Sequence, residues 1–486
     1  MPNGSGYGRS GYCKIALPYR SDWPTRLAAL HAADPLRYPA LLASQSAGTP
    51  RARWDLLLIG NGEGFQGGAG KPVCDLDGSR LDSTAFLDEL AKRWREGHVA
   101  LADAQPPVSS DGPMPAAFRG GWLLLLGYEL AAEIEPKLRL PDNRDGTPAG
   151  LALRCPAAIV LDRQEQRCFL IHEASAEVLA QSVKAQLDLL DDPVVLPPSV
   201  PAFDIEEDES RHFTDGVRRV LDYLAAGDAF QVNLSRGWRL RPRLPEGEAL
   251  DPAALYRSLA GANPAPFAAS LHGPDFHLLS SSPERLVAVR RLNDGSQRVE
   301  TRPIAGTRPR IAGDDDAGRI AELVGHPKER AEHIMLIDLE RNDLGRICRP
   351  GTVKVEELMA VESYAHVHHI ESTVAGELRD DVEPVDVIRA LFPGGTITGC
   401  PKVRCMEIIA ELEGVGRGAY TGAIGYLNHD GDMDLNILIR SLVWDGEALH
   451  LRAGAGIVAD SDPDAELAET RAKARGLLRG LGITDA

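Results

Sequence analysis

The sequence predicts a protein of mixed helices and strands, large enough to bury the core of an enzyme. Of its 486 residues, 43% are hydrophobic and 26% are charged. Short apolar runs of strand length alternate with runs of helical periodicity. A connector rich in proline and acid, residues 191–210, separates region 12–190 from region 211–482. We therefore expect two unlike regions, each with helices and strands.

The N-terminal region contains four predicted strands. They are residues 54–59, 122–126, 157–161 and 168–171. A helical pattern follows over residues 175–190. The glycine-rich stretch 62–71 superficially resembles a phosphate-binding loop, but Phe65 stands where the first glycine should be, and Pro72 replaces the required Ser or Thr. We interpret this stretch as a flexible loop.

The second region carries most of the polar candidate residues. Apolar spacing over residues 217–224 predicts a helix that ends at Gly227, and residues 230–234 form a predicted strand containing Gln231. Residues 392–402 combine three glycines and two threonines ahead of a helical pattern. Such a turn offers backbone amides and hydroxyls to an anion. An ordinary glycine-rich connection before a buried helix is the alternative.

Two pairs of glutamates stand at helical spacing. Glu329 and Glu332, and again Glu466 and Glu469, are three residues apart, so each pair shares a helix face with its carboxylates roughly 5–6 Å apart. Two such helices could supply hard oxygen ligands to Mg²⁺. In a chain this acidic, solvated helix faces are the alternative interpretation.

Composition excludes several classes of protein. The 53 Lys and Arg against 71 Asp and Glu give a net charge of −18, which argues against a nucleic-acid or anionic-membrane partner. The seven cysteines contain no Cys-x-x-Cys pair, as in a reduced cytoplasm without a thiolate zinc motif. No signal peptide or membrane span is evident, so we expect a cytoplasmic protein.

Five motifs occur in an order that resembles the chorismate-utilising enzymes, over nearly the whole chain. They are Ser281-Ser282-Pro283-Glu284-Arg285, residues 301–310, residues 338–346, residues 392–402 and residues 454–461. The resemblance implies an α+β fold of two large, mainly antiparallel β-sheets packed as a sandwich with helices on the outside. It also implies that region 211–482 is a catalytic domain with a Mg²⁺-dependent site for chorismate.

The resemblance implies a role for each candidate residue. Glu284 would be the acid that assists departure of the ring C4 hydroxyl, and His369 would orient the ring or donate to it. The metal shell would be formed, partly through water, by Glu329, Glu332, Glu466 and Glu469. The substrate would be bound by Thr398, Gly399, Tyr420, Arg440, Gly454, Ala455, Gly456 and Lys473. Chorismate is a dianion, so a metal ion and two cationic side chains match its charge.

Gln231 indicates which nucleophile attacks. Relatives that add water carry a lysine base at this position, whereas glutamine cannot take a proton from water at neutral pH. Ammonia is already nucleophilic, so we expect an aminating enzyme with Gln231 at its catalytic centre. A separate glutamine amidotransferase subunit (component II) would deliver the ammonia, since no Cys-His-Glu glutaminase domain is recognisable in this sequence.

Two aminated products remain open. Residues 231–235 and 393–399 resemble members that aminate ring C4, giving the 4-amino-4-deoxychorismate that a downstream aminodeoxychorismate lyase converts to p-aminobenzoate for folate. Ala305 stands where many such members carry a nucleophilic lysine. Without that lysine, either another group or direct substitution must serve at C4, or the enzyme aminates C2 and releases anthranilate and pyruvate. We expect the C4 product. An inactive chorismate-binding or scaffold protein is a third alternative, and Asn436, where relatives usually have Ser, Thr or Cys, has no interpretation.

The N-terminal region also resembles that of aminating relatives. Residues 41–44 and 53–55 match a segment that binds tryptophan in some of them, which makes Ser44 a candidate for an effector pocket. Ala43 replaces the acidic residue usual in feedback-inhibited members, and this argues against control by tryptophan.

Overall fold

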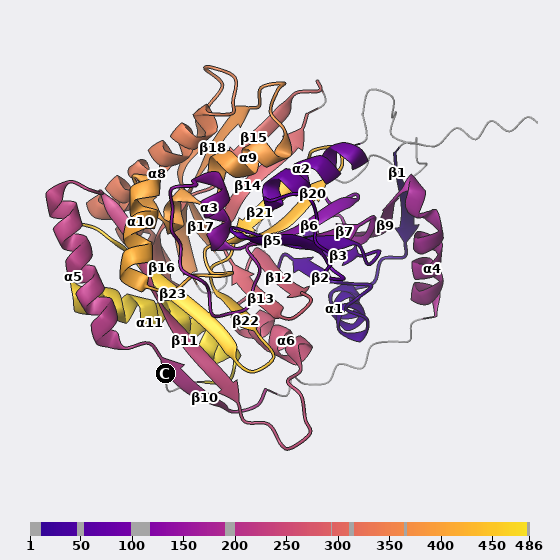
Figure 1. Cartoon of the computed structure of the whole chain (residues 1–486), viewed down its shortest axis with the longest axis horizontal. Helices are drawn as coiled ribbons and strands as arrows, with labels where there is room; N and C mark the ends of the chain where they lie inside the picture. The colour runs from indigo at the N-terminus through magenta and orange to yellow at the C-terminus, as the bar shows by residue number, and fades with distance from the viewer. Residues whose placement is uncertain are drawn as a thin grey trace, which may run out of the picture.

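Two antiparallel sheets form the centre of the protein in the computed structural model (Figure 1). The structure describes residues 11–45, 53–98, 117–189, 200–292, 294–310, 315–363 and 367–483. The first sheet, sheet A, has the strand order β1-β9-β8-β3-β2-β12-β13-β22-β23-β11-β10, with β19 paired to β11. The second, sheet B, has the order β16-β18-β15-β14-β21-β20-β6-β7-β4-β5, with β17 paired to β18.

The strands of sheet A have the following bounds. In sheet order they are β1 (Tyr12–Leu17), β9 (Arg167–Glu173), β8 (Ala157–Asp162), β3 (Trp54–Ile59), β2 (Ala40–Ala43), β12 (Phe267–His272), β13 (His277–Ser282), β22 (Ser441–Trp444), β23 (Leu449–Ile457), β11 (Gln231–Pro242), β10 (Phe203–Glu207) and β19 (Gly399–Cys400). Those of sheet B are β16 (Ile304–Pro309), β18 (Val367–Glu377), β15 (Gln297–Thr301), β14 (Arg285–Arg291), β21 (Met433–Ile437), β20 (Ala423–Asn428), β6 (Gly121–Leu126), β7 (Gly150–Cys155), β4 (Gly64–Gly68), β5 (Lys71–Asp75) and β17 (Lys354–Ser363).

The two sheets pack face to face, and strand alternation explains how. In β3, Leu56 and Leu58 belong to a core shared with Leu123 and Leu125 of β6 in sheet B. Neighbouring residues of a strand point to opposite faces, so Leu57 of β3 faces outward into a separate core. Sheet A and sheet B are thus two layers of a sandwich, and the predicted fold class is confirmed.

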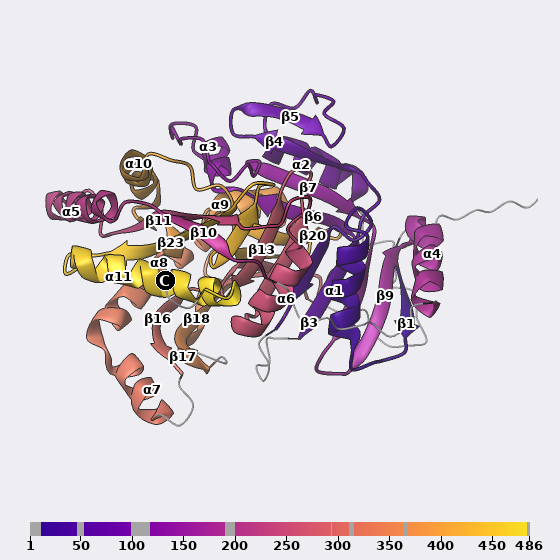
Figure 2. The same ribbon diagram turned by 90° about the horizontal axis from the view of Figure 1, so that it is seen from below.

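Helices cover the outer faces of both sheets (Figures 1 and 2). The outer core of sheet A includes residues of α1 (Trp23–Ala33), α4 (Glu177–Asp188), α6 (Pro252–Ala262) and α11 (Pro463–Gly480). That of sheet B includes residues of α2 (Phe86–Gly97), α8 (Pro327–Gly345) and α9 (Pro384–Leu391). A further core joins β11 and β23 to α5 (Ser210–Ala226) and α10 (Lys402–Glu413).

Both predicted regions contribute strands to both sheets. In sheet A, β2 pairs with β12, and in sheet B, β6 pairs with β20, so region 12–190 is joined to region 211–482 along two seams. The predicted connector 191–210 therefore does not separate two independent sheets. Residues 190–199 lie outside the described chain, and β10 is an edge strand within the predicted connector.

Most predicted elements are present, with one clear exception. The four N-terminal strands and the helix α4 are confirmed, and Gly227 ends α5 with a φ of 82°. The predicted strand 230–234 is the start of the longer β11. The interpretation of residues 62–71 as a flexible loop is wrong, because they form most of the hairpin β4–β5 at the edge of sheet B.

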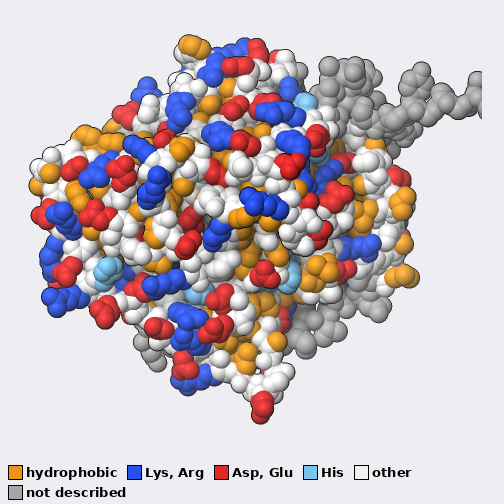
Figure 3. Space-filling view, viewed as in Figure 1, with side chains coloured by type: hydrophobic (Ala, Val, Ile, Leu, Met, Phe, Trp, Pro, Cys, Tyr) orange, Lys and Arg blue, Asp and Glu red, His pale blue; other side chains and the backbone are white. Residues whose placement is uncertain are grey.

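The surface and the cysteines agree with the composition. On the face shown in Figure 3, Lys and Arg are interspersed with Asp and Glu, and neither sign forms a continuous patch. All seven cysteines lie in the described residues, and no disulfide joins them. Within the described ranges, no helix combines the length and the apolar character needed to cross a membrane.

Candidate active site

Glu284 occupies the short connection between β13 and β14, where its side chain is almost fully buried. The residue is 5% exposed. Its backbone is fixed on both sides, because Ile437 N donates to Glu284 O at 3.0 Å and Glu284 N donates to Ser282 Oγ at 3.3 Å. The Thr396 hydroxyl donates to Glu284 Oε1 at 2.7 Å. The local motif therefore holds one carboxyl group rigidly inside the protein.

The surroundings of Glu284 favour its protonated form. Burial raises the pKa of Glu284 to about 8, the hydrogen bond from Thr396 opposes that rise, and the negative charges of Glu340 and Glu371 add to it. At neutral pH the carboxyl group carries a proton that it can donate. This is the condition that the predicted role as an acid requires.

His369 lies on β18, close to Arg440. Burial lowers the pKa of His369 to about 3, helped by the positive charge of Arg440 and opposed by the carbonyl of Gly306. The imidazole is therefore neutral. Its Nδ1 lies 3.3 Å from Gly306 O, and since a carbonyl only accepts, Nδ1 carries the proton. In this tautomer Nε2 is an acceptor, so His369 can orient a ligand but has no second proton to donate.

Arg440 is a cation that lies close to both Glu284 and His369. It lies between β21 and β22 with a φ of 52°, and its carbonyl accepts from Ser281 N at 3.0 Å. Burial lowers the pKa of Arg440, and the nearby Glu284 opposes that shift. Among the described residues, no carboxylate forms an ion pair with its guanidinium group. A partly desolvated guanidinium of this kind suits an anionic ligand.

A second cluster lies on β23, where two glycines let side chains approach the backbone closely. A Cβ atom at Gly454 would lie 2.8 Å from Tyr420 Oη, and one at Gly456 would lie 2.5 Å from Gln231 Nε2. Burial raises the pKa of Tyr420 to about 12, so its hydroxyl remains a donor at neutral pH. The sequence 454–456 therefore forms a bare strand surface between polar side chains.

Buried amide groups beside this strand lack hydrogen-bond partners. Gln231 Oε1 and Asn233 Oδ1 are buried, and neither has a partner in the part of the chain that the structure describes. Asn436, which replaces the Ser, Thr or Cys usual in relatives, also has a buried side-chain nitrogen, Nδ2, without a partner there. Leaving a buried polar group unsatisfied costs about 1–3 kcal/mol, so two such acceptors on β11 point to a ligand.

Lys473 connects α11 to the glycine strand. Its Nζ donates to Gly454 O at 2.9 Å and lies 2.7 Å from Glu469 Oε1. Glu466, about one turn before Glu469 on α11, is only 8% exposed. The C-terminal helix thus brings one cation and two of the predicted metal ligands next to the glycine strand.

The segment from 392 to 402 joins the two clusters. Within it, Thr396 binds Glu284, and the Thr398 hydroxyl donates to Gly394 O at 2.9 Å. Both hydroxyls thus donate within the protein in this structure, and the prediction that they face an anionic ligand stays a prediction. Gly399 has a φ of 131°, and a Cβ atom there would lie 2.1 Å from Gln231 O. Only glycine fits this approach to β11.

An internal ion pair, which sequence reasoning missed, supports this segment. Arg417 and Glu413 are both buried, and the guanidinium contacts the carboxylate at 2.6 Å. Arg417 also donates to Ile397 O at 3.0 Å and to Asn233 O at 2.7 Å. It therefore ties the turn to β11. The four-residue spacing of Glu413 and Arg417 is visible in the sequence, but it does not reveal these carbonyl contacts.

The N-terminal region holds the loop that carries Tyr420. Glu129 Oε1 accepts from Arg417 N at 2.7 Å and from Gly418 N at 3.1 Å, and Asp145 Oδ2 accepts from Ala419 N at 3.0 Å. The first half of the chain is thus part of the support of the candidate site.

The predicted metal ligands lie on two helices. On α8, Glu329 packs against β16, where a Cβ atom at Gly306 would lie 2.2 Å from Glu329 Oε2. Glu332 follows one turn later, and Glu466 and Glu469 lie on α11. In the described chain, no three of these glutamates bring their oxygens within 4.8 Å of one another. Mg²⁺ binds one or two carboxylates together with water and substrate, so this all-oxygen set still fits the ion.

Ala305 and Ser44 are the two remaining positions singled out by the sequence. Ala305 lies on β16 opposite Ile370, one residue before Gly306, and offers no nucleophile. Ser44 lies beside the seam between β2 and β12, where its hydroxyl donates to Pro266 O at 3.0 Å and its backbone N donates to Asp55 Oδ1 at 2.9 Å. These contacts do not test the effector pocket, which stays a prediction.

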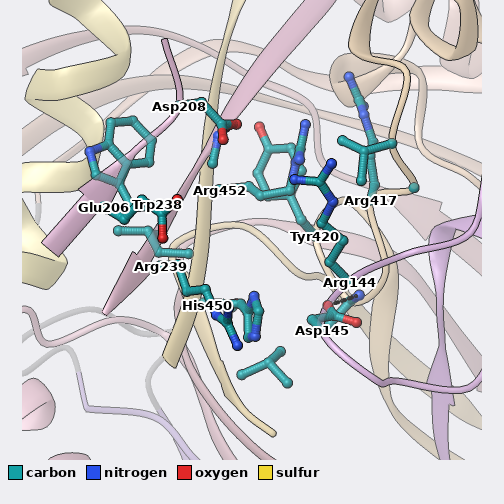
Figure 4. Close-up of a pocket in the computed structure, with 17 residues that line it drawn as sticks. Arg144, Asp145, Glu206, Asp208, Trp238, Arg239, Arg417, Tyr420, His450 and Arg452 are labelled. Atoms are coloured by element: carbon teal, nitrogen blue, oxygen red, sulfur yellow. Dashed lines mark hydrogen bonds between the residues drawn. The ribbon is translucent and has the colours of Figure 1, made fainter. Parts of the chain in front are cut away.

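A cavity of about 410 Å³ opens next to Tyr420 (Figure 4). Its charged lining contains both signs, namely Arg144, Arg239, Arg417 and Arg452 with Asp145, Glu206 and Asp208. Tyr420 is the one predicted site residue among its lining residues. This cavity therefore adjoins the candidate site through Tyr420 and does not contain Glu284 or Arg440.

The buried acid Glu284, the cation Arg440 and the bare strand 454–456 could together bind a small anion and protonate it. The chain belongs to the chorismate binding enzyme family, whose profile matches residues 60–479. This confirms the family resemblance and the predicted chorismate-utilising fold.

Individual relatives carry two different names. Aminodeoxychorismate synthase component 1 of Bacillus subtilis (strain 168) is 41% identical over 379 residues, which cover 76% of this chain and 78% of that protein. Anthranilate synthase component 1 of Acinetobacter calcoaceticus is 39% identical over 399 residues, with coverage of 78% and 77%. The crystal structure of anthranilate synthase component I from Streptococcus pneumoniae TIGR4 superposes with a TM-score of 0.74 at 30% identity, covering 88% of this chain and 93% of that one.

Proposed function

We propose that this chain is an aminodeoxychorismate synthase component I, which aminates chorismate at ring C4 to give 4-amino-4-deoxychorismate. The observation that carries the proposal is the buried, protonated Glu284 next to Arg440. An acid placed beside a cation suits an anionic substrate that must lose a hydroxyl group. The product would enter p-aminobenzoate and folate synthesis after a separate aminodeoxychorismate lyase.

The chemistry balances with the groups present. Glu284 gives its proton to the C4 hydroxyl, which leaves as water when the C4–O bond breaks. The lone pair of ammonia forms the new C4–N bond, and the resulting ammonium group returns one proton to the Glu284 carboxylate. Gln231 Oε1, buried without a partner among the described residues, would accept a hydrogen bond from the incoming ammonia.

The remaining residues would bind and orient the substrate. Arg440 and Lys473 would pair with its carboxylates, while Tyr420 Oη and the strand 454–456 would contact it from the other side. His369, neutral and fixed through Nδ1, would orient the ring. Bound Mg²⁺ would be held by Glu329, Glu332, Glu466 and Glu469, some of them through water, and would offset the charge of a substrate carboxylate.

Ammonia would come from a glutamine amidotransferase subunit, component II. Gln231 supports this proposal, since glutamine cannot act as the base that an attacking water requires. Ammonia attacks through its free lone pair and does not need a base to remove a proton first. Ammonium salts should therefore replace the partner subunit in a simple assay.

Residues 393–399 and the Bacillus subtilis relative support amination at C4. Ala305 supports the second candidate, anthranilate synthase component I, because it provides no side-chain nucleophile next to Gly306 and His369. Under our proposal the C–N bond is formed by direct attack of ammonia and not through an adduct with residue 305.

The products separate the candidates. Purified chain incubated with chorismate, Mg²⁺ and ammonium chloride is expected to form p-aminobenzoate only after aminodeoxychorismate lyase is added. Fluorescent anthranilate together with pyruvate would establish the C2 reaction instead. No turnover at saturating ammonium and Mg²⁺ would favour the inactive scaffold.

The metal ligands can be tested separately. Glu332→Gln removes one anionic oxygen donor, so the Mg²⁺ concentration for half-maximal rate should rise roughly 10–100-fold. Glu96→Gln, an exposed carboxylate on α2, is the matched control and should leave it unchanged. An unaltered Mg²⁺ requirement in Glu332→Gln would remove this residue from the metal shell.

A further inference from the structure

A second group of metal-binding side chains lies at the edge of sheet A, under the start of α4. Cys13 on β1, His172 on β9 and Glu177 on α4 each place a ligand atom within 4.8 Å of the other two. Across the described residues, no other set of three His, Cys, Asp or Glu side chains meets this condition. The group combines a sulfur, a nitrogen and an oxygen donor.

Strand register explains why these residues meet. Cys13 and His172 are directly opposite each other in the antiparallel pair β1–β9, so their side chains leave the same face of the sheet. The chain then passes from β9 into α4, whose first residue is Glu177. The edge strand, its neighbour and the covering helix thus each supply one donor.

The orientation of His172 favours a metal over a hydrogen bond. The side chain is fully buried, and its Nδ1 lies 2.8 Å from Glu173 O, so Nδ1 carries the proton. Its Nε2 has no hydrogen-bond partner in the described chain and lies 3.5 Å from Glu177 Oε2. In this tautomer two lone-pair atoms face each other, and a cation between them would bind both.

The donors select the metal. Zn²⁺ accepts thiolate, imidazole and carboxylate ligands in a tetrahedron, whereas Mg²⁺ prefers oxygen alone. Zinc bonds of about 2.0–2.3 Å place neighbouring donors about 3.3–3.6 Å apart. The 3.5 Å between His172 Nε2 and Glu177 Oε2 already matches this spacing.

We propose that Cys13, His172 and Glu177 form a Zn²⁺ site that clips the edge strand β1 to β9 and α4. Three protein ligands leave one position for water. Figures 1 and 2 both place α4 at the end of the molecule opposite α5, so the clip is distinct from the glutamates of α8 and α11. A metal here would secure an edge strand that has, among the described strands, a neighbour on one side only.

Cobalt substitution tests the site without measuring catalysis. Metal-free, full-length protein titrated with Co²⁺ should develop a thiolate-to-cobalt charge-transfer band whose intensity corresponds to one thiolate-bound ion, and added Zn²⁺ should abolish the band. Cys13→Ala should lose the band, and Cys74→Ala, with a partly exposed cysteine on β5 as matched control, should keep it. No band in the wild-type protein, or a band that survives Cys13→Ala, would overturn the proposal.

A second variant avoids disturbing the buried histidine. Glu177 is exposed, so Glu177→Gln should fold normally, and its Zn²⁺ dissociation constant should rise at least about tenfold. Zn²⁺ should also raise the melting temperature of the wild-type protein relative to the chelated sample, and this shift should vanish in Cys13→Ala. Equal affinity for Zn²⁺ in Glu177→Gln and wild type would exclude Glu177 from the site.

Discussion

The two ends of the candidate active site, at Glu284 and at Lys473, differ in how far their charged side chains are exposed to solvent. At one end Glu284 is 5% exposed, and burial keeps its carboxyl group protonated. At the other end the side chains of Lys473 and Glu469 are 44% and 48% exposed and form an ion pair. A proton donor at neutral pH needs a dry environment to raise its pKa, whereas a lysine keeps its charge in water. The comparison shows that the acid Glu284 and the cation Lys473 depend on opposite degrees of burial within one candidate site.

Replacing Glu284 tests the buried end and should give the largest effect. Glu284→Gln keeps the size of the side chain and removes the proton donor, so kcat should fall about 10²–10⁴-fold while chorismate binding persists. Steady-state kinetics and equilibrium binding measure the two quantities. A variant that retains more than about a tenth of the wild-type kcat would contradict the acid role, and Glu246→Gln in an exposed loop is the control.

The same variant has a predicted effect on stability. The pKa of Glu284 is raised in the fold, so between the unfolded and folded pKa values the unfolded chain releases its proton first, and rising pH lowers stability. Glu284→Gln removes this loss. Its melting temperature at pH 8 should therefore equal or exceed that of the wild type, which separates loss of chemistry from loss of fold.

Arg417 joins the two ends, and its removal should have the next largest effect. Arg417→Met leaves the buried Glu413 carboxylate with less compensation and frees the carbonyls of Ile397 and Asn233. The free energy of unfolding should fall by about 3–5 kcal/mol, as measured by urea denaturation. Arg471→Met, at an ion pair on the surface of α11, should cost far less. Similar losses in both variants would show that the internal ion pair has no special role.

Lys473 tests the exposed end. Lys473→Met removes a charged donor to Gly454 and, under the proposed function, to a substrate carboxylate, so KM for chorismate should rise about tenfold with a smaller change in kcat. The difference from wild type should shrink at high salt, because solvent screens this end. Arg475→Met, exposed on the same helix, is the control. An equal rise in KM in both variants would indicate a general charge effect.

The smallest expected effect concerns Thr396. The enzyme should need protonated Glu284, so its rate should decline above about pH 8. The Thr396 hydrogen bond lowers the pKa of Glu284, so Thr396→Val should move this decline to higher pH, with kcat at pH 7 changing by about fivefold or less. Thr396→Ser should restore the wild-type profile. A shift of the decline to lower pH would mean that the hydroxyl does not act on Glu284.

Local patterns predicted the elements whose formation depends on local periodicity. The strand Trp54–Ile59 and the helix ended by Gly227 follow directly from apolar spacing and a left-handed glycine. The glycine-rich hairpin β4–β5 was misinterpreted because it is stabilised by pairing with β7, which lies far away in the sequence. Sequence spacing contains no information about that partner.

The sequence proposes the residue types of the candidate site, whereas the contacts between them come only from the structure. The raised pKa of Glu284 was expected from burial, but its bond to Thr396 depends on how the turn at 395–397 packs. The role of Arg417 cannot be predicted from sequence spacing, because its carbonyl partners belong to two other elements. The meeting of Cys13 with His172 likewise follows from strand register, which a search for clustered cysteines does not reveal.

Because two strand pairings join region 12–190 to region 211–482, we expect that neither region folds without the other. A gene fragment encoding only residues 211–482 would leave β12 and β20 without their partners β2 and β6. Each sheet would then expose one unpaired strand edge. Such half-molecules would associate with one another or precipitate. Co-expression with residues 12–190 should rescue them, because the missing half supplies both strands and the carboxylates of Glu129 and Asp145 that anchor the Tyr420 loop.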